Sequence, residues 1–120
     1  MAVTWEIVQK EVAGGVWNLH DSVAEFTGYV KITPTIKTVT GSILVTDAIV
    51  YMTPAAASQT LTLPDATASV NAQIIVKNQG STTFTLAAAG SDTIDDESSV
   101  TVYEHESFTV HAYGTNWNII

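Results

Sequence analysis

The stretch Ile74–Leu86, IIVKNQGSTTFTL, decides the fold class because it holds two strand patterns separated by breaker residues. Ile74–Val76 is a continuous run of β-favouring apolar residues, which predicts a strand covered on both faces. In Phe84–Leu86 the apolar residues alternate with threonine, the period-two pattern of a half-buried strand. Asn78 and Gly80 lie between the two patterns and tolerate positive φ, so we expect a hairpin turn there.

The same alternation continues on both sides of this stretch. Period-two segments lie at residues 3–8, 60–64, 99–103 and 107–112, and Gly, Pro, Asn and Asp separate them at roughly 10- to 15-residue intervals. Helix signals are short: one turn at 22–26 with Ser22 as N-cap, and another at 53–59. No internal repeat is evident. We therefore expect an all-β chain, an antiparallel β-sandwich or barrel-like module preceded by an N-terminal strand or arm segment.

A change in composition near residue 38 divides the chain into an N-terminal arm or small subdomain, residues 1–37, and a β-sandwich module, residues 38–120. The first part carries more large apolar residues than a short arm needs: Trp5, Ile7, Trp17, Phe26 and Tyr29. Three interpretations remain open for them. They pack on the chain's own sandwich, form an attachment or subunit interface with aromatic anchors, or make a platform that binds sugars.

The charge excludes several classes of partner. Twelve acidic residues against four lysines give a net charge of −8, and seven of the acids lie in residues 61–120. Binding to nucleic acid or to an anionic membrane needs clustered basic residues, so neither partner is expected. The chain has no cysteine, which fits synthesis in a reducing cytoplasm. The low charged fraction, 13%, suggests that much of the surface is neutral or is covered by other subunits.

Two groups of residues are candidates for chemistry. The carboxylates of Asp92, Asp95, Asp96 and Glu97 could bind Ca²⁺, but they lack EF-hand spacing, so a solvated turn is the default interpretation. His105, between two glutamates, and the nearby His111 could suggest zinc or acid–base chemistry.

No third ligand for a zinc site is evident, and Glu104–Glu106 reads as an exposed turn between strands. The sequence also lacks a nucleophile elbow and a phosphate-binding loop. We therefore expect a protein that is not an enzyme, with no cofactor and no resident metal; a hydrolase subunit ranks last among the alternatives.

Specific roles follow for the phrases of the second half. Pro64 ends a strand because it has no N–H, and Ile94 is an apolar plug between Asp92 and Asp95, whose carboxylates are expected to make local Asx turns. Trp117, three residues before the C-terminal residue given, is expected on a last strand, where its ring covers one end of the core.

In order, these phrases resemble a small β module of tailed-bacteriophage virion proteins, found in head-decoration, tail-fibre and baseplate components. The phrases are SILVTDAIVYMT, TLTLPDA, IIVKNQGSTTFTL, AGSDTID and SFTVHAYGTNWNII, and the resemblance covers roughly residues 40–120. The chain departs from the module at Asp96 and Glu97, where glycine is common, and at Tyr103–Ser107, where a Pro-Gly turn is common. These departures affect the expected turn geometry more than the expected fold.

The resemblance implies a structural protein of the phage particle, located on the virion surface. A capsid decoration (cement) protein that stabilises the head is the favoured expectation, with the major capsid protein or other virion subunits as partners. A tail-fibre or baseplate component that binds host carbohydrate is the alternative. The same resemblance implies a homo-oligomer, with a trimer as the favoured state.

Overall fold

The computed structural model describes residues 17–20, 23–26 and 31–120, and the chain divides into two compact units, Met1–Ile32 and Thr33–Ile120. In the first unit, β1 (Trp17–His20) pairs antiparallel with β2 (Val23–Phe26). The predicted helical turn at 22–26 is wrong, because the backbone of Val23–Phe26 forms cross-strand pairs with β1 instead of closing a local turn. The strand predicted at residues 3–8 lies outside the described residues.

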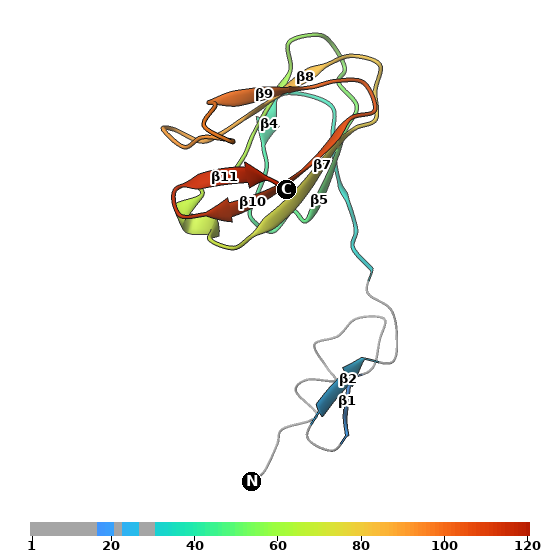
Figure 1. The fold of residues 1–120 in the computed structure, drawn as a ribbon. Helices are drawn as coiled ribbons and strands as arrows, with labels where there is room; N and C mark the ends of the chain where they lie inside the picture. Colours follow the sequence, from blue (N-terminus) through green and yellow to red (C-terminus); the bar gives the residue numbers. More distant parts are fainter. Residues whose placement is uncertain (1–16, 21–22, 27–30) are drawn as a thin grey trace. The chain divides into compact units, whose positions relative to one another are not determined.

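The regular secondary structure of the second unit consists of β-strands and one short 3₁₀ helix, which confirms the predicted all-β class for the described residues (Figure 1). Its short 3₁₀ helix, η1 (Thr67–Ser69), was not predicted, and the helical turn predicted at 53–59 is replaced by bends and a turn. Its strands are β3 (Thr35–Lys37), β4 (Gly41–Ser42), β5 (Ile49–Met52), β6 (Thr60–Thr62), β7 (Gln73–Asn78), β8 (Phe84–Ala87), β9 (Ser99–Val102), β10 (Ser107–Tyr113) and β11 (Asn116–Ile119).

The strands form two sheets through a repeated path of the chain. One sheet has the order β11-β10-β7-β5-β3 and the other the order β4-β6-β8-β9. Each of β3, β5 and β7 is followed in the chain by a strand of the other sheet, and β3, β5 and β7 are parallel, as are β4, β6 and β8. We call each set of two consecutive strands, one from each sheet, a rung: rung 1 is β3 and β4, rung 2 is β5 and β6, and rung 3 is β7 and β8.

This arrangement differs from the sequence-based expectations in four respects. The sheets are mixed instead of antiparallel, and a structural repeat of three rungs is present although the sequence shows none. The turn at Asn78–Gly80 does not form a hairpin, because β7 and β8 belong to different sheets. β3, assigned by composition to the N-terminal segment, pairs with β5 inside the second unit.

Stacking of the rungs explains the glycine of the turn after β7. A Cβ atom at Gly80 would lie 3.0 Å from Pro54 Cδ, a distance that side chains rarely tolerate. The Gln79 amide donates to Met52 O at 2.8 Å, so the corner of rung 3 rests directly on the corner of rung 2.

Antiparallel strands complete both sheets after rung 3. β10 pairs with β7 and then with β11, and β9 pairs with β8 (Figure 1). β7 is therefore an inner strand with neighbours on both edges. Its side chains still alternate between buried and half-buried, so the predicted coverage of both faces is wrong: its apolar run reflects an inner position in the sheet.

The core contains residues from both sheets. Val50, Ile74 and Val110 of the five-stranded sheet and Leu61 and Leu86 of the four-stranded sheet belong to one buried cluster. Trp117 of β11 also belongs to it and is fully buried, which confirms the predicted role of the aromatic ring near the C-terminal residue.

Candidate functional site

The aromatic residues predicted to form an interface fall in the N-terminal part of the chain. Trp5, Ile7 and Tyr29 lie outside the described residues. The backbone of β1 and β2 places Trp17 directly opposite Phe26.

Two carboxylates of the acidic stretch accept hydrogen bonds from backbone amides that lie far away in the sequence. Asp92 Oδ2 accepts a hydrogen bond from the Ala66 amide at 2.9 Å, and Asp95 Oδ1 accepts one from the Ile119 amide at 3.1 Å. The predicted local Asx turns are therefore wrong, because each carboxylate reaches a donor more than twenty residues away. Ile94 between them is fully buried, which confirms the predicted plug.

These bonds attach the loop at 93–97 to the outer edge of β11. The Trp117 amide donates to Thr93 O at 2.8 Å, and the Asp95 amide donates to Trp117 O at 3.0 Å. Together with the Ile119–Asp95 bond, they use the backbone groups of β11 that point away from β10. Asp95 and Asp96 both adopt positive φ, 47° and 71°, which lets the loop turn back after pairing. In the described residues no three His, Cys, Asp or Glu side chains are close enough to hold a metal ion.

The predicted histidine cluster is not brought together as a site. His105 Nε2 lies 3.4 Å from Glu104 Oε1, and both side chains are more than half exposed, so water screens the pair. The His105 carbonyl accepts a hydrogen bond from Lys77 Nζ. His111 lies on β10, and its carbonyl accepts a 3.5 Å bond from Asn118 Nδ2.

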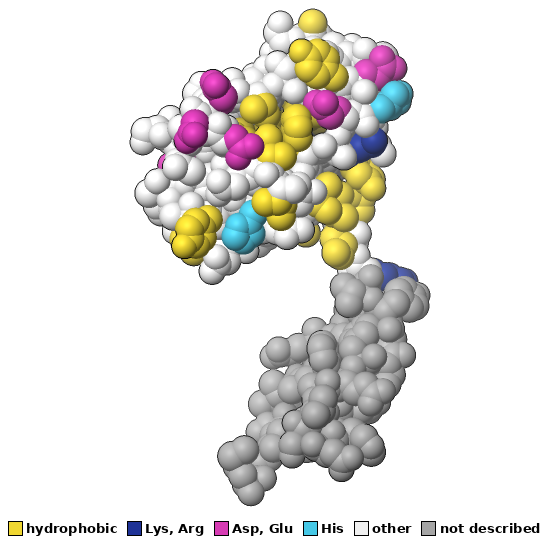
Figure 2. Space-filling view, viewed as in Figure 1, with side chains coloured by type: hydrophobic (Ala, Val, Ile, Leu, Met, Phe, Trp, Pro, Cys, Tyr) yellow, Lys and Arg dark blue, Asp and Glu magenta, His cyan; other side chains and the backbone are white. Residues whose placement is uncertain are grey.

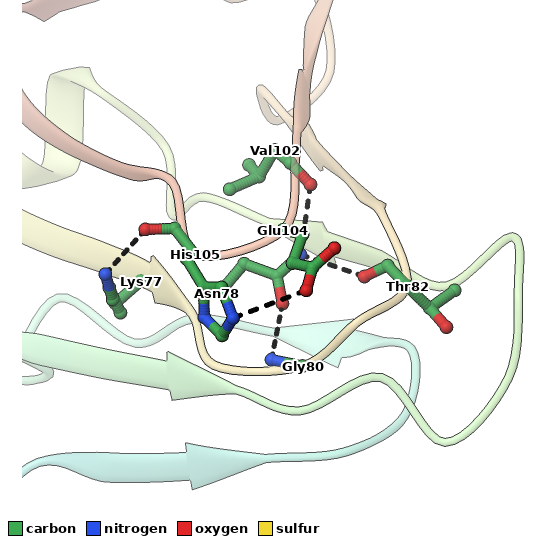
Figure 3. Close-up of polar contacts among 7 residues, drawn as sticks. All are labelled: Lys77, Asn78, Gly80, Thr82, Val102, Glu104 and His105. Atoms are coloured by element: carbon green, nitrogen blue, oxygen red, sulfur yellow. Dashed lines mark hydrogen bonds and ion pairs between the residues drawn. The ribbon is translucent and has the colours of Figure 1, made fainter.

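The sequence predicted only a turn role for Asn78, but in the structure its side chain forms a buried polar centre. The side chain is fully buried at the end of β7 and points into the corner of the turn (Figure 3). Its Nδ2 donates to Thr82 O at 2.9 Å and to Val102 O at 3.1 Å, while its Oδ1 accepts from the Gly80 amide at 2.8 Å. The β7 strand, the turn and the end of β9 are thus joined through one amide.

The segments that carry the resemblance contact one another around Trp117, and we call this group of contacts the Trp117 joint. The indole of Trp117 donates from Nε1 to Pro64 O at 3.0 Å. Trp117 also forms an isolated parallel β-bridge with Ile94. Asn116 Oδ1 accepts a hydrogen bond from the Thr93 amide at 3.2 Å. The Leu-Pro, Asp-Thr-Ile-Asp and Asn-Trp phrases, far apart in sequence, therefore contact one another. The sequence marked these residues but could not show that they meet.

Comparison with known proteins adds no relative: no family model, no curated protein and no solved structure matches the chain. No helix in the described part of the chain has the length and apolar character needed to cross a membrane.

Proposed function

We propose that the chain is a non-enzymatic structural protein of a tailed-bacteriophage virion, favouring a capsid decoration protein that stabilises the head. The observation that carries the proposal is the joint between Pro64, Ile94 and Trp117. These residues belong to the phrases by which the sequence resembles the virion module. Their polar groups are used for holding backbone segments together, which suits a module whose role is mechanical.

The acidic and amide side chains near this joint support the same interpretation. Asp92, Asp95 and Asn116 each accept a hydrogen bond from a distant backbone amide. A carboxylate used in this way links two segments that lie far apart in the sequence. The side chains that first suggested calcium binding therefore have a structural role available to them.

We further propose that the two sheets work as a sandwich, since Val76 and Leu86 of opposite sheets share one core cluster. The proposed assembly is a homo-oligomer, with a trimer favoured, bound to the major capsid protein or other virion subunits. In this proposal the N-terminal segment carries the contacts with the particle, and the unit Thr33–Ile120 supplies the rigid body.

The test is the location of the protein in particles produced from the genome that encodes it. Mass spectrometry of purified particles and electron microscopy with a labelled antibody would be combined. Label over the capsid lattice is the expected result. Label at the tail would replace the decoration role with the tail-fibre or baseplate alternative, in which host-carbohydrate binding is the next assay. Absence from intact particles would overturn the virion proposal.

A further inference from the structure

The two ends of the stack of rungs differ in whether further strands and loops cover them. Beyond rung 3, β9 and the β10–β11 pair extend the sheets, and the loop at 93–97 covers the edge of β11. At the other end, β3 and β4 of rung 1 are the edge strands of their sheets, and no described residue pairs with their outer edges. An uncovered terminal repeat in a stacked fold exposes backbone groups and apolar side chains.

Rung 1 and the loop after it concentrate exposed apolar side chains. Of nine large hydrophobic residues exposed in the described part of the chain, four lie within ten residues of each other: Ile36, Val39, Leu44 and Val45. Their exposed fractions run from 49% to 62%. Exposed apolar residues gathered in this way mark interaction sites more often than single ones do. We call residues 33–45 the rung 1 surface.

The rung 1 surface also lacks acidic residues in a strongly acidic protein. Its one charged residue is Lys37, whereas the whole chain has twelve acids against four lysines. On the face drawn in Figure 2, the acidic side chains gather in the upper half of the described unit, apart from the yellow patch at its lower right. Asp47, just after this segment, is bonded to Thr35 and Leu44, but two copies with a net charge of −8 still repel each other least where carboxylates are few.

Hydrogen bonds hold this surface in one conformation. Thr35 Oγ1 donates to Asp47 Oδ1 at 2.7 Å, and the Leu44 amide donates to Asp47 Oδ2 at 2.8 Å, so the loop after β4 is tied to β3. Gln59 Oε1 accepts from the Thr40 amide at 2.6 Å and from its hydroxyl at 3.0 Å. A surface ordered before binding loses little conformational entropy on association.

We propose that copies of this chain bind one another through the rung 1 surface, which rests on the proposed homo-oligomer and assigns its interface. A closed symmetric oligomer places the same surface of each copy around its axis, where Val39 and Leu44 of neighbouring copies pack together. β3 and β4 have only three and two residues, so the apolar side chains contribute more than backbone pairing between the edges.

The test uses the full-length chain and two charge-introducing variants, Val39→Glu and Leu44→Glu. Both positions are more than half exposed, so the free energy of unfolding should change little. Val70→Glu is the matched control, because Val70 is 53% exposed and lies at the end of η1. Sedimentation velocity would measure association across micromolar concentrations, and hydrogen exchange would follow the amides of 35–42.

The expected result is a wild-type oligomer, an association constant about tenfold or more weaker in both variants, and an unchanged control. Amide protection at 35–42 should rise with protein concentration. An oligomer that persists in both variants, or dissociates equally in Val70→Glu, overturns the rung 1 interface and leaves the homo-oligomer standing. Protection of 35–42 at every concentration would mean that something other than a second copy covers the surface. A wild-type protein that stays monomeric overturns both proposals.

Discussion

Asn78 shows how one buried amide fixes the path of the chain at the residue scale. Its side chain satisfies two carbonyls and one amide at the point where β7 leaves its sheet. An apolar side chain here would remove all three of these hydrogen bonds. The sequence shows Asn78 and Gly80 as turn residues, but either a hairpin or a crossing between sheets fits that chemistry.

Asn78→Ala should lower the free energy of unfolding by about 3 kcal/mol, because it removes the three hydrogen bonds of a fully buried amide. Asn118→Ala is the control: Asn118 is half-buried and makes a single 3.5 Å bond to His111 O. We expect that control to lose less than about 1 kcal/mol. Urea unfolding followed by tryptophan fluorescence measures both, and equal losses would contradict a special role for Asn78.

Asp65 gives a pH-dependent prediction. Hydrogen bonds from the Thr67 hydroxyl, the Thr67 amide and the Ala68 amide lower the pKa of the Asp65 carboxyl below its usual value. A lowered folded-state pKa stabilises the fold above the unfolded pKa of about 3.9, and this stabilisation is lost as the pH falls through the folded pKa.

Thr67→Ala removes the hydroxyl donor, so the pKa of Asp65 should rise towards its usual value and the stabilisation that is lost on acidification should become smaller. Carboxyl NMR titration of Asp65 measures the shift directly. A titration curve that does not change in Thr67→Ala would show that the hydroxyl has no influence on this carboxyl.

At the scale of elements, the strands were predictable and their pairing was not. Alternation located β6, β8, β9 and β10, because one face of each contributes to the core. The rungs are unevenly spaced: Thr35 lies beside Val50, fifteen positions later, whereas Val50 lies beside Val76, twenty-six later. A sequence repeat needs a constant period, so connections of unequal length conceal this one.

The edge of β11 illustrates the same limit for the candidate site. Asp92 and Asp95 were recognised as turn-forming residues, but their donors, Ala66 and Ile119, come from distant segments. Sequence spacing carries no information about such partners until the sheet order is known. The bonds cover the outer edge of a strand that would otherwise be open to pairing with another chain.

Replacing Asp95 tests this covering of the edge. Asp95→Ala should cost about 1 to 2 kcal/mol, because it removes the acceptor of the Ile119 amide. Asp96→Ala is a matched control, since Asp96 also has positive φ and its carboxylate accepts no hydrogen bond from the described residues. The difference between the two variants in chemical unfolding isolates the hydrogen bond from backbone strain.

Loss of the Asp95 bond should also leave the β11 edge more open. Hydrogen exchange at the Ile119 amide is therefore expected to be faster in Asp95→Ala than in Asp96→Ala. Equal exchange rates and equal stabilities would show that the carboxylate does not hold the loop against the strand.

At the scale of the whole molecule, the chain separates into two units, and its extended core belongs to the second. Thr33–Ile120 contains both rung-built sheets, the Asn78 centre and the Trp117 joint. A module with its own core can fold without the preceding segment. In the proposed virion role, such a module is used at different places in a particle, so the other part of the chain is the natural carrier of the attachment contacts.

The last prediction therefore concerns Trp5 and Trp17. Each change to alanine should weaken attachment to particles by about 2 kcal/mol or more, the size expected of aromatic anchors at an interface. Unfolding of Thr33–Ile120, followed by the fluorescence of its buried Trp117, should change little. Tyr113→Ala is the control, because Tyr113 is an aromatic residue of the second unit with 72% of its surface exposed. Co-sedimentation with particles measures attachment. If both tryptophan variants unfold the entire protein while a chain lacking residues 1–32 still binds particles, these aromatics belong to a core and the attachment contacts lie in the rung-built unit.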